Sequence, residues 1–188
     1  ALNYLRSKEK YPKKCFIGVP QRLDRPVSGV VLFAKKKSVL KMLVEIFSKR
    51  QLDKYYYAIV ETPPVKPEGE LVNWLVKNTE IRKAIIYDNE VRDSMRVILR
   101  YKTITQNATG TLLEVKLITG KFHQIRAQLA HIGCPIIGDT HYGSNKNYKE
   151  NSICLHAHRL RLTHPVTGEP LEINAPVPDD EIWQSFFC

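Results

Sequence analysis

The stretch 18–36, "GVPQRLDRPVSGVVLFAKK", places a single acid, Asp24, between Arg22 and Arg25. A carboxylate here repels any phosphate that the two arginines attract, so its position requires a reason. The plainer interpretation is an ion-paired turn aspartate before Pro26, and the alternative is a carboxylate that reacts with a substrate. The reactive role requires partner side chains from elsewhere in the chain.

A second group of residues could bind a metal. Cys154, His156 and His158 alternate in "CLHAH", so on a strand they would point to one face. Structural zinc prefers four ligands, and the sequence offers no second clustered pair. We therefore regard a zinc site as the weaker interpretation and expect no metal.

The charge of the chain indicates the class of partner. Its 188 residues include 29 Lys and Arg against 19 Asp and Glu, a formal net charge of +10. Such an excess favours a polyanion, above all a nucleic acid, although solubility alone also explains basic charge.

No apolar stretch is long enough for a membrane span or a secretory signal, so we expect a soluble cytoplasmic protein. The cysteines lack a C-x-x-C pair, which favours reduced thiols: Cys15, Cys134, Cys154 and Cys188.

The first third of the chain predicts a strand–helix–strand unit. Apolar residues recur at helical spacing over 38–50, and Ser38 is a suitable N-cap. Runs rich in β-branched and aromatic residues flank this helix. The predicted elements are a short helix over 1–9, strands over 15–19 and 30–36, the helix over 38–50 and a strand over 53–61.

The rest of the chain alternates apolar and polar residues, which favours antiparallel strands. Prolines and Gly69 mark a loop after the strand over 53–61, and "NATG" predicts a hairpin turn. The predicted elements are strands over 81–88, 95–104 and 111–118, a helix over 122–135 stopped by Gly133, and a strand over 155–165. The fold class is thus α+β, with a large mixed, mainly antiparallel sheet and flanking helices.

Two long motifs resemble one enzyme family. "QRLDRPVSG" (21–29) is similar to the "HRLDRxTSG" signature of the RluA-like pseudouridine synthases, and "TGKFHQIRAQLAHIGCPIIGDTHYG" (119–143) is similar to their "TGRxHQIRxHLxxxGxPIxGDxxYG". "KYYYA" (54–58) fits their short "KxYxA" pattern, and the segment from Leu155 to Pro178 resembles their C-terminal part. The resemblance covers nearly everything between Cys15 and Pro178.

The resemblance implies a fold with a central catalytic cleft and an activity that needs neither cofactor nor metal. Members of the family convert uridine in structured RNA to pseudouridine by moving the ribose bond from the ring nitrogen to C5. By their place in the motifs, Asp24 is the catalytic carboxylate, Arg126 the cation that keeps it ionised, and Tyr56 the ring beside the base. Whether Tyr56 removes the C5 proton or only stacks on uracil stays open.

Further residues are implied as contacts to RNA. The target uridine must leave its stack, and Arg22 is the residue that would assist its extrusion. Arg25, Lys54, His123 and Gln124 are the other expected substrate contacts. For any single lysine, a solvated surface charge is the plainer interpretation.

The match is imperfect at three motif positions. Gln21 stands where the family usually has histidine, Val27 where threonine is common, and Lys121 where the second motif has arginine. The chain also lacks the "KPxG" segment that precedes the aspartate loop in the family. We therefore expect 1–188 to be one catalytic domain without its N-terminal segment.

The sequence thus predicts a monomeric, cytoplasmic RNA pseudouridine synthase that acts on ribosomal or transfer RNA. The alternative is a noncatalytic RNA-binding or RNA-folding module on the same scaffold. That alternative does not need Asp24, Tyr56 and Arg126 together, so their joint occurrence favours catalysis.

Overall fold

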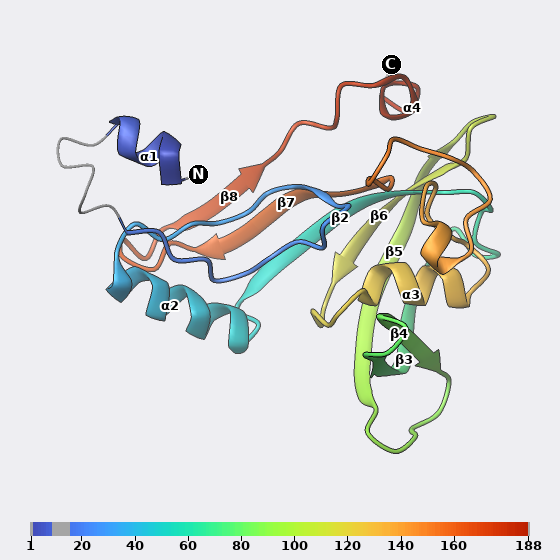
Figure 1. The fold of residues 1–188 in the computed structure, drawn as a ribbon, viewed down its shortest axis with the longest axis horizontal. Coiled ribbons are helices and arrows are strands. Elements are labelled where there is room, and N and C mark those ends of the chain that lie inside the picture. The colour runs from blue at the N-terminus through green and yellow to red at the C-terminus, as the bar shows by residue number, and fades with distance from the viewer. Residues whose placement is uncertain (1, 9–15, 188) are drawn as a thin grey trace. The chain divides into compact units, whose positions relative to one another are not determined.

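A computed structural model describes residues 2–8 and 16–187 (Figure 1). Within these residues the chain forms two compact units. The smaller is built from the described parts of 1–23, 31–52 and 161–172, and the larger from 24–30, 53–160 and 173–187. No helix in these described ranges is long and apolar enough to cross a membrane.

The smaller unit contains two helices, α1 (Leu2–Lys8) and α2 (Lys37–Ser48). The predicted periodicity of α2 is confirmed, because Leu43 is buried and the other apolar positions of that stripe are partly buried. The prediction of Ser38 as the N-cap was wrong. Lys36 occupies the cap position, with extended backbone angles and no side-chain cap bond, so Ser38 already lies inside the first turn.

The strands predicted over 15–19 and 30–36 are also corrected. Cys15 lies outside the described residues, and the rest of the two segments meet only in one isolated bridge between Gly18 and Ala34. Pro20 lacks an N–H group, which prevents the pairing from continuing in that direction. The first strand of the predicted strand–helix–strand unit is therefore reduced to a single bridge.

The described residues form a mixed, mainly antiparallel sheet, as predicted. In the described chain the strands follow the order β1-β7-β2-β6-β5-β3-β4, and β8 pairs with β7. The β1 strand runs parallel to β7, whereas the β2–β6, β6–β5, β5–β3 and β3–β4 pairs are antiparallel. The strands are β1 (Ser28–Gly29), β2 (Leu52–Val60), β3 (Glu68–Asn78), β4 (Lys83–Tyr87), β5 (Met95–Gln106), β6 (Thr111–Leu117), β7 (Leu155–Thr163) and β8 (Pro170–Asn174).

The β5–β6 hairpin forms at the predicted turn. Asn107 accepts hydrogen bonds on its side-chain oxygen from the Thr109 and Gly110 amides, at 2.8 and 3.2 Å. Asparagine favours turns through such local bonds. The strand β3, in contrast, was not predicted from the sequence, because one loop signal, Pro67, directly precedes it and another, Gly69, lies in its first residues.

The helix α3 (Gln124–His131) packs against β3 and β4, as Figure 1 shows. A small core joins them: Leu75 from β3, Ala84 from β4, Val97 from β5 and Ala127 from α3. The predicted helix is confirmed, although it begins at Gln124 rather than residue 122. Beyond the helix, Gly133 takes the left-handed conformation (φ 77°) that favours glycine.

Two short helices follow. The 3-10 helix η2 (Thr140–Tyr142) also contacts α3, and α4 (Glu181–Gln184) lies near the C-terminus. Asp180 caps α4 by accepting a hydrogen bond from the Trp183 amide. The α3–η2 region brings polar side chains of the second long motif together.

Candidate active site

The loop that carries Asp24, residues 20–27, is hydrogen-bonded through its C-terminal end to residues 153–157, which include the start of β7. The Ile153 amide donates to the Pro26 carbonyl at 3.1 Å, and the Val30 amide donates to the Ala157 carbonyl at 2.9 Å. Gly29 has a φ of 118° and lies so close to Ala157 that a Cβ there would come within 2.3 Å of its carbonyl oxygen. The backbone on the C-terminal side of Asp24 is thus anchored within the larger unit.

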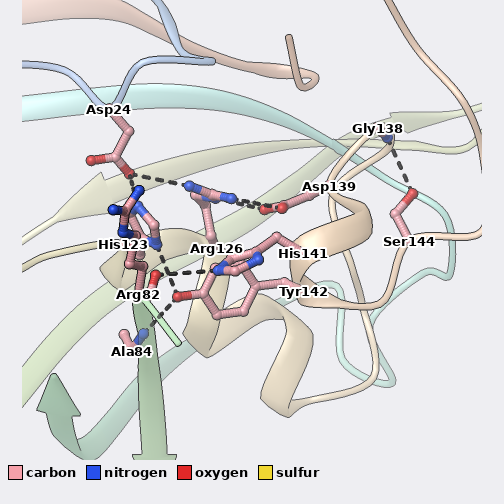
Figure 2. A network of polar contacts seen from close by, with 10 residues as sticks. All are labelled: Asp24, Arg82, Ala84, His123, Arg126, Gly138, Asp139, His141, Tyr142 and Ser144. Atoms are coloured by element: carbon pink, nitrogen blue, oxygen red, sulfur yellow. Dashed lines mark hydrogen bonds and ion pairs between the residues drawn. The ribbon is translucent and has the colours of Figure 1, made fainter. Parts of the chain in front are cut away.

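The carboxylate of Asp24 faces the first turn of α3 (Figure 2). Its Oδ2 lies 3.8 Å from Arg126 Nη1 and 3.9 Å from His123 Nε2. The Asp24 side chain is 30% exposed, whereas that of Arg126 is only 6% exposed. Partial burial raises the pKa of Asp24, Arg126 lowers it, and the negative charge of Asp139 raises it further. Asp24 is therefore accessible to a substrate and only loosely paired with its cation.

Arg126 itself is bound tightly to a second acid. Its Nε donates to Asp139 Oδ2 at 2.7 Å and its Nη2 donates to Asp139 Oδ1 at 2.8 Å. The guanidinium carbon also lies 4.9 Å from the centre of the Tyr142 ring. Although burial alone would lower the pKa of Arg126, the neighbouring Asp139 and Asp24 raise it, so Arg126 stays charged.

His123 is oriented by a short chain of hydrogen bonds. The Ala84 amide donates to the Tyr142 hydroxyl oxygen at 2.7 Å, and the hydroxyl lies 3.0 Å from His123 Nδ1. The hydroxyl has its own proton to donate, so this arrangement favours an unprotonated Nδ1 and an N–H at Nε2, toward Asp24. Burial and the nearby Arg126 lower the pKa of His123 to about 4, so the ring is neutral at physiological pH.

Tyr56 is buried in the middle of β2 and interacts electrostatically with the same carboxylate. Its pKa is raised to about 12, first by burial and then by the charge of Asp24. Side chains alternate along a strand, and Tyr57 instead stacks on His158 with ring centres 3.8 Å apart. Tyr56 thus lies on the face of β2 opposite to that of Tyr57.

Comparisons with known proteins place this chain in a family. The family model described as RNA pseudouridylate synthase matches residues 2–131. The chain belongs to that family.

Two curated relatives and one solved structure illustrate the similarity. The chain is 35% identical over 179 residues to the ribosomal large subunit pseudouridine synthase C of Vibrio vulnificus, covering 88% of this chain and 53% of the relative. It is 32% identical over 184 residues to the tRNA pseudouridine synthase C of Vibrio parahaemolyticus, covering 88% of this chain and 73% of the relative. The chain thus spans about half of the first relative's length.

The human RNA pseudouridylate synthase domain containing 4 shares the fold. It superposes with a TM-score of 0.73 at 23% identity, over 87% of this chain and 72% of the human chain. The fold predicted from the motif resemblance is thereby confirmed.

The other predicted substrate contacts of this family member lie in different surroundings. Arg22 is exposed in the smaller unit, and Arg25 is exposed in the turn beside Asp24. Lys54 is partly buried, with its ammonium nitrogen close to Gly120. These contacts to RNA stay predictions.

Gln124, in contrast, is buried and fully engaged. Its side-chain oxygen accepts from the Thr119 hydroxyl at 2.9 Å and the Lys121 amide at 3.2 Å. Its amide nitrogen donates to the Ile98 carbonyl at 3.1 Å and the Gln128 side chain at 3.0 Å. Gln124 therefore stabilises the segment before α3 through hydrogen bonds. A direct RNA contact would require these bonds to break.

Sequence reasoning missed two members of the site. Asp139 and Tyr142 lie in "GDTHYG", which was recognised as part of the second motif but given no chemical role. The family model's match ends at residue 131, before both. The signal was the occurrence of an acid and an aromatic residue within a motif whose helix carries Arg126.

The residues of the alternative zinc site have other partners. His156 Nδ1 lies 2.8 Å from the Ser28 hydroxyl, and His158 Nε2 lies 3.2 Å from Glu114. Cys154 is a buried free thiol whose pKa is raised, chiefly by burial. Among residues 2–8 and 16–187, no three such side chains are grouped as ligands of one ion.

Proposed function

We propose that this chain is the catalytic domain of an RNA pseudouridine synthase that isomerises uridines in ribosomal or transfer RNA. The observation that carries the proposal is the grouping of Asp24, Arg126 and Tyr56 in a member of the RNA pseudouridylate synthase family. The two Vibrio relatives, named as ribosomal and transfer RNA enzymes, support RNA as the substrate class.

In the proposed reaction Asp24 acts at the sugar. Its carboxylate either bonds to C1′ as the bond to N1 breaks, or stabilises the cationic sugar that this break creates. After the uracil has turned, C5 bonds to C1′ and the carboxylate is released. The proton leaves C5 and a proton returns to N1, so the product is an isomer of the substrate. The reaction needs no net oxidant or reductant, and we propose that it uses neither metal nor cofactor.

Arg126 and His123 complete the surroundings of the carboxylate. Arg126 keeps Asp24 ionised despite its partial burial, because it contributes an opposite charge 3.8 Å away. The neutral His123 offers an N–H rather than a second full charge. We propose that this N–H contacts the bound nucleotide and closes on Asp24 when water is displaced.

Tyr56 acts in its protonated form in this proposal. A phenol whose pKa is about 12 is almost entirely un-ionised between pH 6 and 9. That state suits a ring that stacks on uracil and a hydroxyl that forms hydrogen bonds, and it disfavours a standing phenolate base. The proton on C5 becomes acidic once C5 has bonded to C1′, and it is removed only at that stage.

Basic residues on the surface would bind the RNA backbone. Lys77 is exposed, and its ammonium lies 5.0 Å from the centre of the Phe122 ring, which in turn stacks on His123. Arg22 remains our candidate for assisting extrusion of the uridine, and Arg25 and Lys54 for further contacts. We also propose that the protein works as a monomer in the cytoplasm.

The test is an isomerisation assay on transcribed ribosomal and transfer RNA with the wild type and the Asp24→Asn variant. We expect pseudouridine with the wild type only, and RNA affinity retained in the variant. Asp93→Asn is a matched control, because it removes an exposed carboxylate that lies 3.6 Å from its neighbour Arg92. An active D24N variant would refute the role of Asp24, and RNA binding without product in the wild type would favour the noncatalytic alternative.

A further inference from the structure

The Arg126 guanidinium is shared unequally by two carboxylates. Asp139 binds the Nε and Nη2 edge at 2.7 and 2.8 Å, and Asp24 lies 3.8 Å from the remaining nitrogen, Nη1. Figure 2 shows the three groups in a row, with Arg126 in the middle. A bidentate pair fixes the plane of a guanidinium as well as its position. The contact with Asp139 therefore decides which nitrogen faces Asp24.

The acid that holds Arg126 is itself held rigidly by its loop. The Asp139 amide donates to the Ile136 carbonyl at 2.9 Å, and the Asp139 carbonyl accepts from the amides of Tyr142 and Ser144 at 2.9 and 3.1 Å. The Ser144 hydroxyl accepts from the Gly138 amide at 3.1 Å. The Asp139 side chain is 1% exposed, so it has no access to solvent or to a bound RNA.

We propose that Asp139 is a positioning residue: by binding Arg126 from behind, it keeps the guanidinium from forming a tight bidentate pair with Asp24. The proposal rests on the proposed function. A carboxylate bound on both oxygens would lose nucleophilicity and would have to break two charge-assisted hydrogen bonds to reach C1′. With Asp139 present, Asp24 keeps an opposite charge nearby and a free oxygen for the sugar.

The charges around Asp24 predict the direction in which its pKa shifts when Asp139 is replaced. Arg126 faces it from α3 and His123 from the position just before that helix. Asp139, His141 and Tyr142 belong to the loop that follows α3. Tyr56 interacts with it from β2, and Arg25 is the exposed cation next to it in the sequence. Arg126 lowers the pKa of Asp24 and Asp139 raises it. Removing the Asp139 charge and freeing Arg126 both lower that pKa.

The first experiment compares Asp139→Asn with Asp139→Glu in single-turnover assays across pH. In D139N we expect the rate to fall roughly 100-fold, as for other misplaced catalytic groups, and the acid limb of the profile to move to lower pH. In D139E the charge is kept and the geometry changes, so the rate falls while the acid limb stays. RNA affinity remains at the wild-type value in both variants.

The second experiment needs no turnover. Carbon-13 NMR of carboxyl-labelled free protein, with Asp24 assigned through D24N, follows the Asp24 titration in the wild type, D139N and D139E. We expect a lower pKa in D139N than in the wild type. If D139N fails to fold, because removing one partner of a buried ion pair is strongly destabilising, D139E carries the rate test, and a D139E rate equal to that of the wild type then overturns the role of Asp139.

The outcomes separate the two proposals. An active wild type whose D139N and D139E variants keep its rate and its acid limb overturns the role of Asp139 and leaves the proposed function intact. An unchanged Asp24 titration in folded D139N also overturns it. A wild type without isomerase activity overturns the proposed function, whereas the titration still reports whether Asp139 controls the Asp24–Arg126 pair.

Discussion

Replacing Tyr142 by phenylalanine tests whether the Tyr142 hydroxyl both stabilises β4 and orients His123. The hydroxyl accepts a hydrogen bond from the Ala84 amide at 2.7 Å and lies 3.0 Å from His123 Nδ1. Ala84 is buried and belongs to β4, the last strand in the sheet order, so its amide depends on this acceptor. The phenylalanine ring would keep the contact with Arg126.

The expected cost follows from the group left without a partner. A buried amide that loses its acceptor destabilises a protein by about 1–3 kcal/mol, so we expect Y142F to lower the free energy of unfolding by about 2 kcal/mol. The catalytic rate should also fall by roughly 10-fold, since 1.4 kcal/mol corresponds to that factor and His123 loses the group that orients it.

Urea denaturation and single-turnover kinetics measure the two effects. Tyr87→Phe is the matched control, because Tyr87 ends the same strand and is 38% exposed. We expect that control to stay within about 0.5 kcal/mol of the wild type. A Y142F protein as stable and as fast as the Y87F control would refute the reasoning about both hydrogen bonds.

Three further predictions concern the loop, the partner and the tyrosine. Gly29→Ala should lower the unfolding free energy by about 1–3 kcal/mol in urea titrations and slow catalysis, because a Cβ would meet the Ala157 carbonyl at 2.3 Å and displace the aspartate loop; full stability would contradict that contact. Lys77→Met should weaken RNA binding and reduce the slope of log affinity against log salt by about one in titrations at several salt concentrations. The control is Lys66→Met, which should leave the slope unchanged because Lys66 precedes β3 at the end opposite to Lys77. Equal slopes in all three proteins would contradict a phosphate contact at Lys77. Because the pKa of Tyr56 is about 12, the population of its protonated phenol stays nearly constant between pH 8 and 10. With that form active, the rate should not rise tenfold per pH unit over this range. Such a rise in stopped-flow or quench assays would show that ionised Tyr56 is the active form.

Local elements were predictable where local signals agree with one another. The helix α3 has both its apolar spacing and a glycine stop, and the β5–β6 turn has an asparagine that bonds to its own backbone. The 15–19 strand failed because an apolar run does not reveal whether a partner strand exists. The Ser38 cap failed because the helix is capped at Lys36, two residues earlier than the residue type suggested.

The sequence by itself predicted the family and the α+β class, which are confirmed, and it marked the acid, the arginine and the tyrosine as candidate site residues. These predictions depend on residue types at fixed spacing within motifs. Only the tertiary structure decided their relations. It brought Asp24 within 3.8 Å of an arginine from a distant helix, gave that arginine a tighter bond to Asp139, and turned Gln124 into the interior. Distances between segments depend on how the sheet and α3 pack, and the energy of a charge depends on its burial and its neighbours, neither of which a linear motif records.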